Sequence, residues 1–155
     1  TEDFVRAAAA EGVPILGICF GHQLVAQAFG GTVRKFDGGW NCGLQAYDFI
    51  DSPTPRHLIA WHQDQVMEPP ADAEIIATSP RCRYAAMRLG QRILTVQPHP
   101  EFTADYIREH AVTRRDVVGS DNVEIALASL AGATKSDDLS GFLINFLHQV
   151  IDTTD

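Results

Sequence analysis

The sequence has few of the features that mark disulfide-rich, membrane or zinc proteins. Its three cysteines, Cys19, Cys42 and Cys82, are too few and too far apart for a disulfide framework, and no CxxC or Cys/His spacing predicts a metal site. The longest uncharged apolar run, residues 12–21, contains a proline and falls short of the ~20 residues that span a bilayer. An odd number of cysteines with no signal-like segment predicts a cytoplasmic protein.

Positive charge is also scarce. The 155 residues carry 12 Lys+Arg against 20 Asp+Glu, a net charge of −8. Nucleic acids and anionic membranes require a cationic surface, so we expect neither as a partner. The length and the 45% hydrophobic content are typical of one globular domain with its own core, and we expect residues 1–155 to form a single domain.

Hydrophobic periodicity predicts an α/β protein. The apolar run at 13–18 has the composition of a strand buried on both faces, between helices at 2–11 and 21–29. A middle region of strands and turns follows, including a hairpin around Gly90, and the last third is helical. The other predicted strands are 32–36, 44–50, 58–61, 74–78, 84–89 and 93–96, and the other predicted helices are 103–110, 122–130 and 137–150, the last with Ser136 as its N-cap.

The segment Gly-Ile-Cys-Phe-Gly at 17–21 lies where the buried strand meets a helix. This is the pattern of a nucleophile elbow, with Cys19 as the nucleophile and glycines that permit the tight turn. The helix N-terminus behind the sulfur is expected to lower the thiol pKa, and the N–H of Phe20 is placed to donate to an oxyanion. For Cys42 and Cys82, an inert buried role fits better.

A second segment supplies a partner for this nucleophile. His99 follows the strand at 93–96 directly, in a loop stiffened by Pro98 and Pro100, and Glu101 comes two residues later. A histidine in this position can take the thiol proton and later protonate a leaving amine, while the carboxylate orients the ring. The two segments together predict a Cys-His-Glu triad.

These two segments, Gly-Ile-Cys-Phe-Gly-His-Gln at 17–23 and Gln-Pro-His-Pro-Glu-Phe at 97–102, resemble the class I, triad-type glutamine amidotransferases. The resemblance runs from Val13 to about Phe102. Together with Gly-Gly-Trp-Asn at 38–41, it is similar to stand-alone members, the GMP-synthase-like proteins and the γ-glutamyl peptidases. It implies a three-layer, flavodoxin-like open sheet flanked by helices and a γ-glutamyl thioester intermediate. It also implies no cofactor or metal, and a synthase partner that accepts the released ammonia.

The resemblance also assigns roles to single positions. Cys19 matches the nucleophile, His99 the base and Glu101 the orienting acid. Gln23 matches a glutamine-binding residue whose amide would meet the α-amino or α-carboxyl end of the substrate. The segment that matches the wall of the glutamine pocket contains Trp61, His62, Gln63 and Asp64, with Trp61 where many members have serine. An alternative stays open, in which Trp61 is a core residue and His62 a loop histidine whose hydrogen bonds are satisfied.

The family's segment upstream of the elbow has no counterpart in this sequence. In the family it supplies strands and a second oxyanion N–H, so we expect an N-terminally truncated domain with an exposed apolar sheet edge. Three functions remain open: hydrolysis of the glutamine γ-carboxamide, hydrolysis of γ-glutamyl peptides or amines, and a non-catalytic binding or regulatory module of the same fold.

Overall fold

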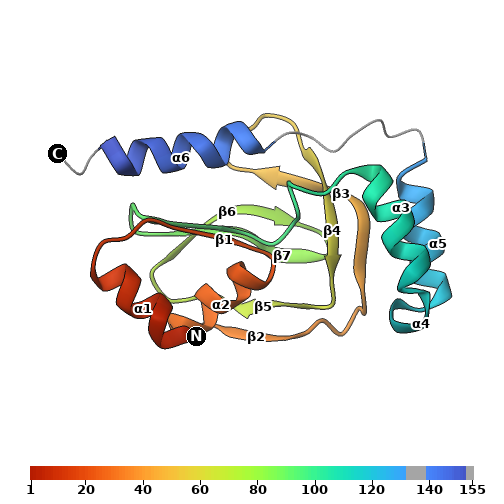
Figure 1. Cartoon of the computed structure of the whole chain (residues 1–155), viewed down its shortest axis with the longest axis horizontal. Coiled ribbons are helices and arrows are strands. Elements are labelled where there is room, and N and C mark those ends of the chain that lie inside the picture. The colour runs from red at the N-terminus through yellow and green to blue at the C-terminus, as the bar shows by residue number, and fades with distance from the viewer. Residues whose placement is uncertain (132–138, 153–155) are drawn as a thin grey trace.

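The computed structural model describes residues 1–131 and 139–152, in which strands form a mixed sheet with helices on both faces (Figure 1). The helices are α1 (Glu2–Ala10), α2 (Phe20–Ala28), α3 (Ala104–Thr113), α4 (Arg115–Val118), α5 (Ser120–Ser129) and α6 (Ser140–Asp152). The strands are β1 (Ile15–Ile18), β2 (Thr32–Lys35), β3 (Asn41–Phe49), β4 (Arg56–His62), β5 (Asp64–Glu68), β6 (Ala73–Ser79), β7 (Cys82–Leu89) and β8 (Ile93–Val96).

The main sheet has six strands in the order β1-β8-β7-β6-β3-β4. Strands β1 and β8 are parallel, with Ile15 opposite Ile93 and Ile18 opposite Val96, and the other pairs are antiparallel. Strands β2 and β5 form a separate antiparallel ribbon. The predicted α/β class, a sheet flanked by helices, is confirmed.

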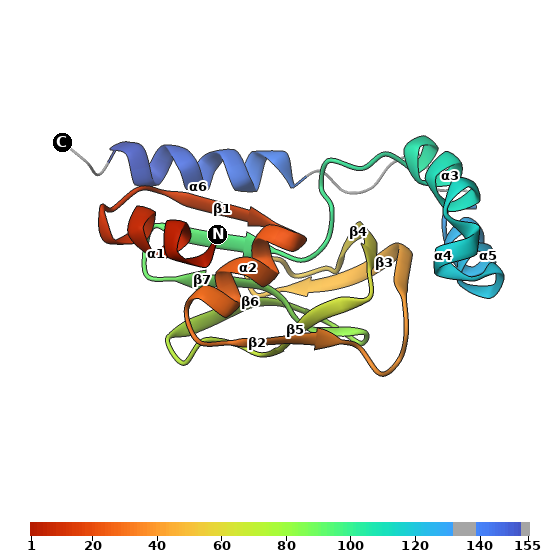
Figure 2. The same cartoon turned by 60° about the horizontal axis from the view of Figure 1, so that its bottom comes forward.

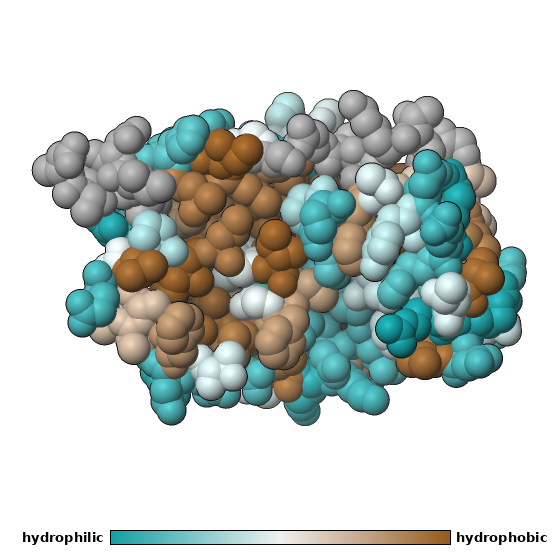
Figure 3. All heavy atoms as spheres, in the orientation of Figure 1, coloured by the Kyte–Doolittle hydropathy of each residue, from teal (hydrophilic) through white to brown (hydrophobic). Residues whose placement is uncertain are grey.

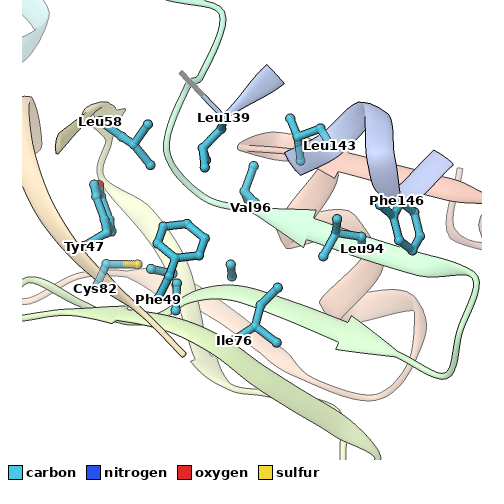
Figure 4. Close-up of a cluster of buried hydrophobic side chains, with 13 residues drawn as sticks. Tyr47, Phe49, Leu58, Ile76, Cys82, Leu94, Val96, Leu139, Leu143 and Phe146 are labelled. Carbon is cyan, nitrogen blue, oxygen red and sulfur yellow. The ribbon is translucent and has the colours of Figure 1, made fainter. Parts of the chain in front are cut away.

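Two hydrophobic clusters cover opposite faces of the sheet. On one face α6 packs its apolar side on the strands (Figures 1 and 4). On the other, α1 and α2 pack with β5 against β7 and β8. The first cluster includes Tyr47, Phe49, Leu58, Ile76, Cys82, Leu94, Val96, Leu139, Leu143 and Phe146, and the second includes Val5, Val25, Ala26, Val66, Met87, Leu89 and Ile93.

Helices α3, α4 and α5 form a separate group beside β3 and β4, as Figure 2 shows from a second direction. At Gly43 the backbone has a φ of 86° and lies against α5, where an added Cβ would be 2.8 Å from the Cα of Ala126. The N–H of Leu44 donates to Ser129 Oγ at 2.8 Å. Glycine at this position therefore lets the helix contact the strand directly.

The predicted elements differ from the observed ones at a few places. A strand, β5, covers residues 64–68, where the sequence analysis predicted none, because its backbone completes the ribbon with β2. Strand β3 starts three residues earlier than predicted, and the short helix α4 was not predicted. Helix α6 is confirmed within the described residues, but its predicted start, with Ser136 as cap, lies outside them.

Strand β1 forms one edge of the six-stranded sheet in the described part of the chain. Hydrophobic residues gather on the face where α1, α2, β1 and α6 lie (Figure 3). An apolar groove there is lined by Leu16, Ile18, Pro100, Glu101, Leu143, Ile144 and Leu147. This groove lies between β1, helix α6 and the loop after β8. Among the described residues, no helix has the length and apolar character needed to cross a bilayer.

Candidate active site

Cys19 occupies a strained turn between β1 and α2. Its φ is 49° and its ψ −100°, and within residues 1–131 and 139–152 it is the one non-glycine residue with a positive φ. Its N–H donates to the carbonyl of Val96 on the neighbouring strand at 2.9 Å. L-residues adopt this backbone region only when the surrounding structure holds them there, and such residues cluster at functional sites.

The two glycines that flank this turn have different reasons to be there. A Cβ on Gly17 would lie 2.8 Å from the backbone of Gly21 and 2.9 Å from the methyl carbon of Thr95. A Cβ on Gly21 would meet nothing within 4 Å. A side chain at position 17 would therefore clash with the elbow, whereas position 21 has room for one.

A pair of alanine substitutions tests this difference. We expect Gly17→Ala to lower the free energy of unfolding by about 1–3 kcal/mol, because backbone atoms of the elbow must move. Gly21→Ala lies within α2 and is expected to leave stability unchanged or raise it by up to ~1 kcal/mol. Urea unfolding of the two variants measures both effects. Equal losses of stability would contradict this account of the turn.

The sulfur of Cys19 is partly buried and has two hydrogen-bond donors. Gln97 Nε2 donates to Sγ at 3.5 Å, and the backbone N–H of Phe20 also donates to it. Burial nevertheless raises the pKa of this thiol to about 11, with a smaller contribution from the charge of Glu101. The predicted lowering of the pKa is therefore wrong for the free protein, because desolvation of the thiolate outweighs the donors at the helix N-terminus.

His99 and Glu101 form a close pair on the loop after β8. His99 Nδ1 lies 2.6 Å from Glu101 Oε1, and the imidazole stacks on the ring of Phe102 with centroids 3.9 Å apart and planes 1° from parallel. The backbone N–H of His99 donates to the carbonyl of Ile59 on β4 at 2.8 Å. With its Nδ1 proton directed to the carboxylate, the ring keeps Nε2 as its basic nitrogen.

The sheet places these residues at the same end. Strands β1 and β8 are parallel neighbours whose last residues, Ile18 and Val96, are paired, so Cys19 and the loop with His99 both follow carboxyl ends of adjacent strands. The charge of Glu101 is close enough to raise the pKa of Cys19. In open α/β sheets this end is where ligands bind.

Gln23 and His62 are both buried beside the elbow. Gln23 Nε2 donates to the carbonyl of Asp64 at 2.7 Å and to Gln97 Oε1 at 3.2 Å, so both of its amide protons are engaged. Gln23 is the predicted substrate-binding residue, and only its amide oxygen remains available to bind a ligand. The carbonyl of Asp64 lies 3.1 Å from His62 Nδ1, and Asn41 Nδ2 lies 3.2 Å from His62 Nε2.

These contacts engage both ring nitrogens of His62, which ends strand β4 and does not lie in a loop. An amide nitrogen can only donate and a carbonyl oxygen can only accept, so His62 carries its proton on Nδ1 and accepts at Nε2. Burial lowers its pKa to about 4, which keeps it neutral near pH 7. Gln63 is half-buried, and its carbonyl accepts from the N–H of Phe36 at 2.9 Å.

Trp61 is half-buried in a row of rings that ends at His99. The row joins β4 to α3 and to the loop after β8, with centroids of successive rings 3.9–6.0 Å apart. Trp61 also packs against the hydrophobic clusters of α3 and α5. In order, the rings are those of Trp40, Trp61, His110, Tyr106, Phe102 and His99.

His22, which follows the elbow, is fully buried. Its Nδ1 lies 2.8 Å from Thr95 Oγ1, and burial lowers its pKa to about 3. It packs α2 on β8. Across the described ranges 1–131 and 139–152, no cluster of three or more His, Cys, Asp or Glu side chains could hold a metal ion.

Gln97 is the site residue that the sequence analysis left without a role. It is fully buried, and its side chain lies between Gln23 and the sulfur of Cys19. A sequence signal existed, since a glutamine directly after an uncharged, mostly apolar strand and two residues before the candidate base is expected to find buried partners. The partners themselves come from α2 and are visible only in the fold.

The chain is similar in sequence to parts of several known proteins. The chain is 38% identical over 96 residues to a glutamine-hydrolyzing GMP synthase of Aeropyrum pernix, a match covering 58% of this chain and 19% of that protein. It is 32% identical over 105 residues to γ-glutamyl peptidase 2 of Arabidopsis thaliana, covering 61% and 42%. One component of the glutamine-hydrolyzing GMP synthase of Methanopyrus kandleri is 40% identical over 102 residues, covering 57% and 52%. The matches thus span about half or less of these relatives.

Solved structures share the fold. The structure of a glutamine amidotransferase from Thermotoga maritima superposes with a TM-score of 0.70 at 18% identity, covering 98% of this chain and 66% of that one. A glutamine amidotransferase from Methylobacillus flagellatus gives a TM-score of 0.65 at 28% identity, covering 72% and 48%. The family pattern of glutamine amidotransferase class-I matches residues 1–115. This chain therefore belongs to the class I glutamine amidotransferase family.

Proposed function

We propose that this chain hydrolyses the γ-carboxamide of glutamine through a γ-glutamyl thioester on Cys19. One observation carries the proposal. Cys19 is held in a strained turn at the carboxyl end of β1, and the His99–Glu101 pair leaves the carboxyl end of the adjacent parallel strand. A nucleophile, a base and an acid that orients the base, on one end of a sheet, are the parts that acyl transfer requires.

The chemistry follows from these parts. His99 takes the thiol proton as Sγ forms a bond to the γ-carbon, and the oxyanion accepts a hydrogen bond from the N–H of Phe20. The protonated imidazole, steadied by Glu101, gives its proton to the leaving nitrogen, the C–N bond breaks, and ammonia departs. Water, deprotonated by the same imidazole, attacks the thioester, which releases glutamate and restores the thiol.

A raised thiol pKa makes the base indispensable in this scheme. With a pKa of about 11, the free Cys19 is almost entirely protonated at neutral pH. Attack therefore requires proton transfer to His99 during the reaction, rather than a thiolate that already exists.

A second substrate class fits the same mechanism. The matched γ-glutamyl peptidases bear names that refer to γ-glutamyl peptides, and a γ-glutamyl amide with a larger leaving amine would need the same thioester. Trp61 and the aromatic row near His99 favour a leaving group that packs against rings. If glutamine is the substrate, we expect the released ammonia to pass to a synthase partner. If a γ-glutamyl peptide or amine is the substrate, no ammonia acceptor is needed.

Product analysis separates the two substrate classes. We expect the protein to release ammonia from glutamine, and trapping with acid to leave a γ-glutamyl adduct on Cys19 that mass spectrometry can locate. Release of the amine from a γ-glutamyl dipeptide, with little ammonia from glutamine, would favour the second class. The matched control is Cys42→Ala, a buried cysteine on β3, which should keep the activity that Cys19→Ala loses. Absence of ammonia, of amine and of the adduct would contradict both and favour a non-catalytic module.

A further inference from the structure

A continuous set of buried and part-buried hydrogen bonds ends on the sulfur of Cys19. Gln97 is its last member, since its Nε2 donates to Sγ at 3.5 Å while its Oε1 accepts from Gln23 Nε2 at 3.2 Å. Gln97 is completely buried, and its backbone N–H donates to the carbonyl of Ala85 at 2.7 Å. From its outer end the set comprises Asn41, His62, the carbonyl of Asp64, Gln23, Gln97 and Cys19.

The orientation of the Gln97 amide is decided by a backbone carbonyl. The backbone carbonyl oxygen of Asp64 can only accept a hydrogen bond. The Gln23 side-chain atom that lies 2.7 Å from it is therefore the amide nitrogen, Nε2. That nitrogen presents its second proton to Gln97, which must therefore turn its oxygen toward Gln23. The amide nitrogen of Gln97 is left facing the sulfur. Turning the amide round would set two donors against each other at 3.2 Å and leave the sulfur facing an oxygen.

We propose that Gln97 is a positioning residue for the nucleophile: its locked amide holds the Cys19 sulfur in place and stabilises the thiolate that forms when the proton leaves. The catalytic consequence rests on the proposed function, but the hydrogen bond itself does not. A hydrogen bond to a charged acceptor is stronger than one to a neutral acceptor, so the donation favours the ionised sulfur over the thiol.

The other groups around the sulfur do not duplicate this contribution. Glu101, on the loop after β8 with His99, raises the pKa of Cys19. Cys82 on β7 and Tyr47 on β3 also couple to the sulfur, but burial raises the pKa of Cys82 to about 12 and that of Tyr47 above its usual range. Both therefore stay neutral up to about pH 10. From α2, the backbone N–H of Phe20 is the remaining donor.

Alkylation of Cys19 by iodoacetamide tests the proposal without any substrate. Methionine has nearly the shape of glutamine and no amide, so Gln97→Met removes the donor and keeps the volume. Peptide mass spectrometry measures the rate of Cys19 alkylation at a series of pH values between 7 and 10. We expect this rate to fall about tenfold at every pH, which corresponds to a rise of about one in the pKa of the thiol. Loss of packing alone would expose the sulfur and raise the rate, which is the opposite sign.

The matched control is Gln65→Met, a buried glutamine on β5, which should leave the Cys19 alkylation profile unchanged. If circular dichroism shows that Gln97→Met does not fold, Gln97→Asn replaces it, because the shorter amide withdraws the donor from the sulfur and should give the same fall. An unchanged or faster alkylation of Cys19 in the folded variant would overturn the proposal. Since no turnover is measured, these outcomes are independent of whether glutamine is the substrate.

Discussion

Replacing His99 with alanine is expected to lower kcat/KM for the γ-glutamyl substrate by about 10⁴-fold while the fold is retained. The thiol of Cys19 has a pKa of about 11, so at neutral pH very little thiolate exists without a base. The same imidazole protonates the leaving nitrogen, and its removal therefore affects both halves of the first step. Steady-state kinetics with circular dichroism as the fold check would measure the loss.

Two comparisons sharpen this test. His148→Ala, on the exposed side of α6, removes a histidine far from the elbow strand in sequence and should keep the wild-type rate. Glu101→Gln should cost less than Cys19→Ala, because the carboxylate orients the ring and does not react. In His99→Ala, activity should recover as the pH approaches the pKa of Cys19, since hydroxide can then deprotonate the thiol. Wild-type rates at neutral pH would remove His99 from the mechanism.

Acid is expected to destabilise the fold through two buried histidines. Burial lowers the pKa of His22 to about 3 and that of His62 to about 4, so both stay neutral in the folded protein at pH 5. In the unfolded chain both bind a proton below about pH 6.5. Their contribution to stability is therefore complete above the unfolded pKa and is lost as the pH falls toward the folded values.

The size of this effect is large for one domain. Between about pH 8 and pH 5 the two histidines together should remove roughly 4 kcal/mol from the free energy of unfolding, against a typical total of roughly 5–15 kcal/mol. Urea unfolding at a series of pH values measures the slope, to which these two histidines should contribute about two protons bound on unfolding. His62→Asn should lower the slope by about one proton, and the exposed His148→Gln should leave it unchanged. A flat profile from pH 8 to pH 5 would show that neither histidine is held neutral.

Much of the fold was open to prediction from sequence because its signals are local. The run at 13–18, the helix at 21–29 and the hairpin around Gly90 depend on periodicity and on turn residues, and the structure has each of them. Strand β5 was missed because residues 64–68 form a strand only by pairing with β2, a distant segment. Pairing between distant segments leaves no local pattern to recognise.

By itself, the sequence determined the chemical types at the site: a cysteine between glycines where a strand becomes a helix, and a histidine followed by a glutamate after a later strand. Tertiary structure decided how those groups behave. Burial raises the pKa of Cys19 where the helix N-terminus alone predicted a fall, and it makes His62 a neutral packing residue. It also places Gln97 against the sulfur with its amide orientation set by Asp64. The physical reason is that desolvation and hydrogen-bond direction depend on what surrounds a group in space, which neighbours along the chain do not specify.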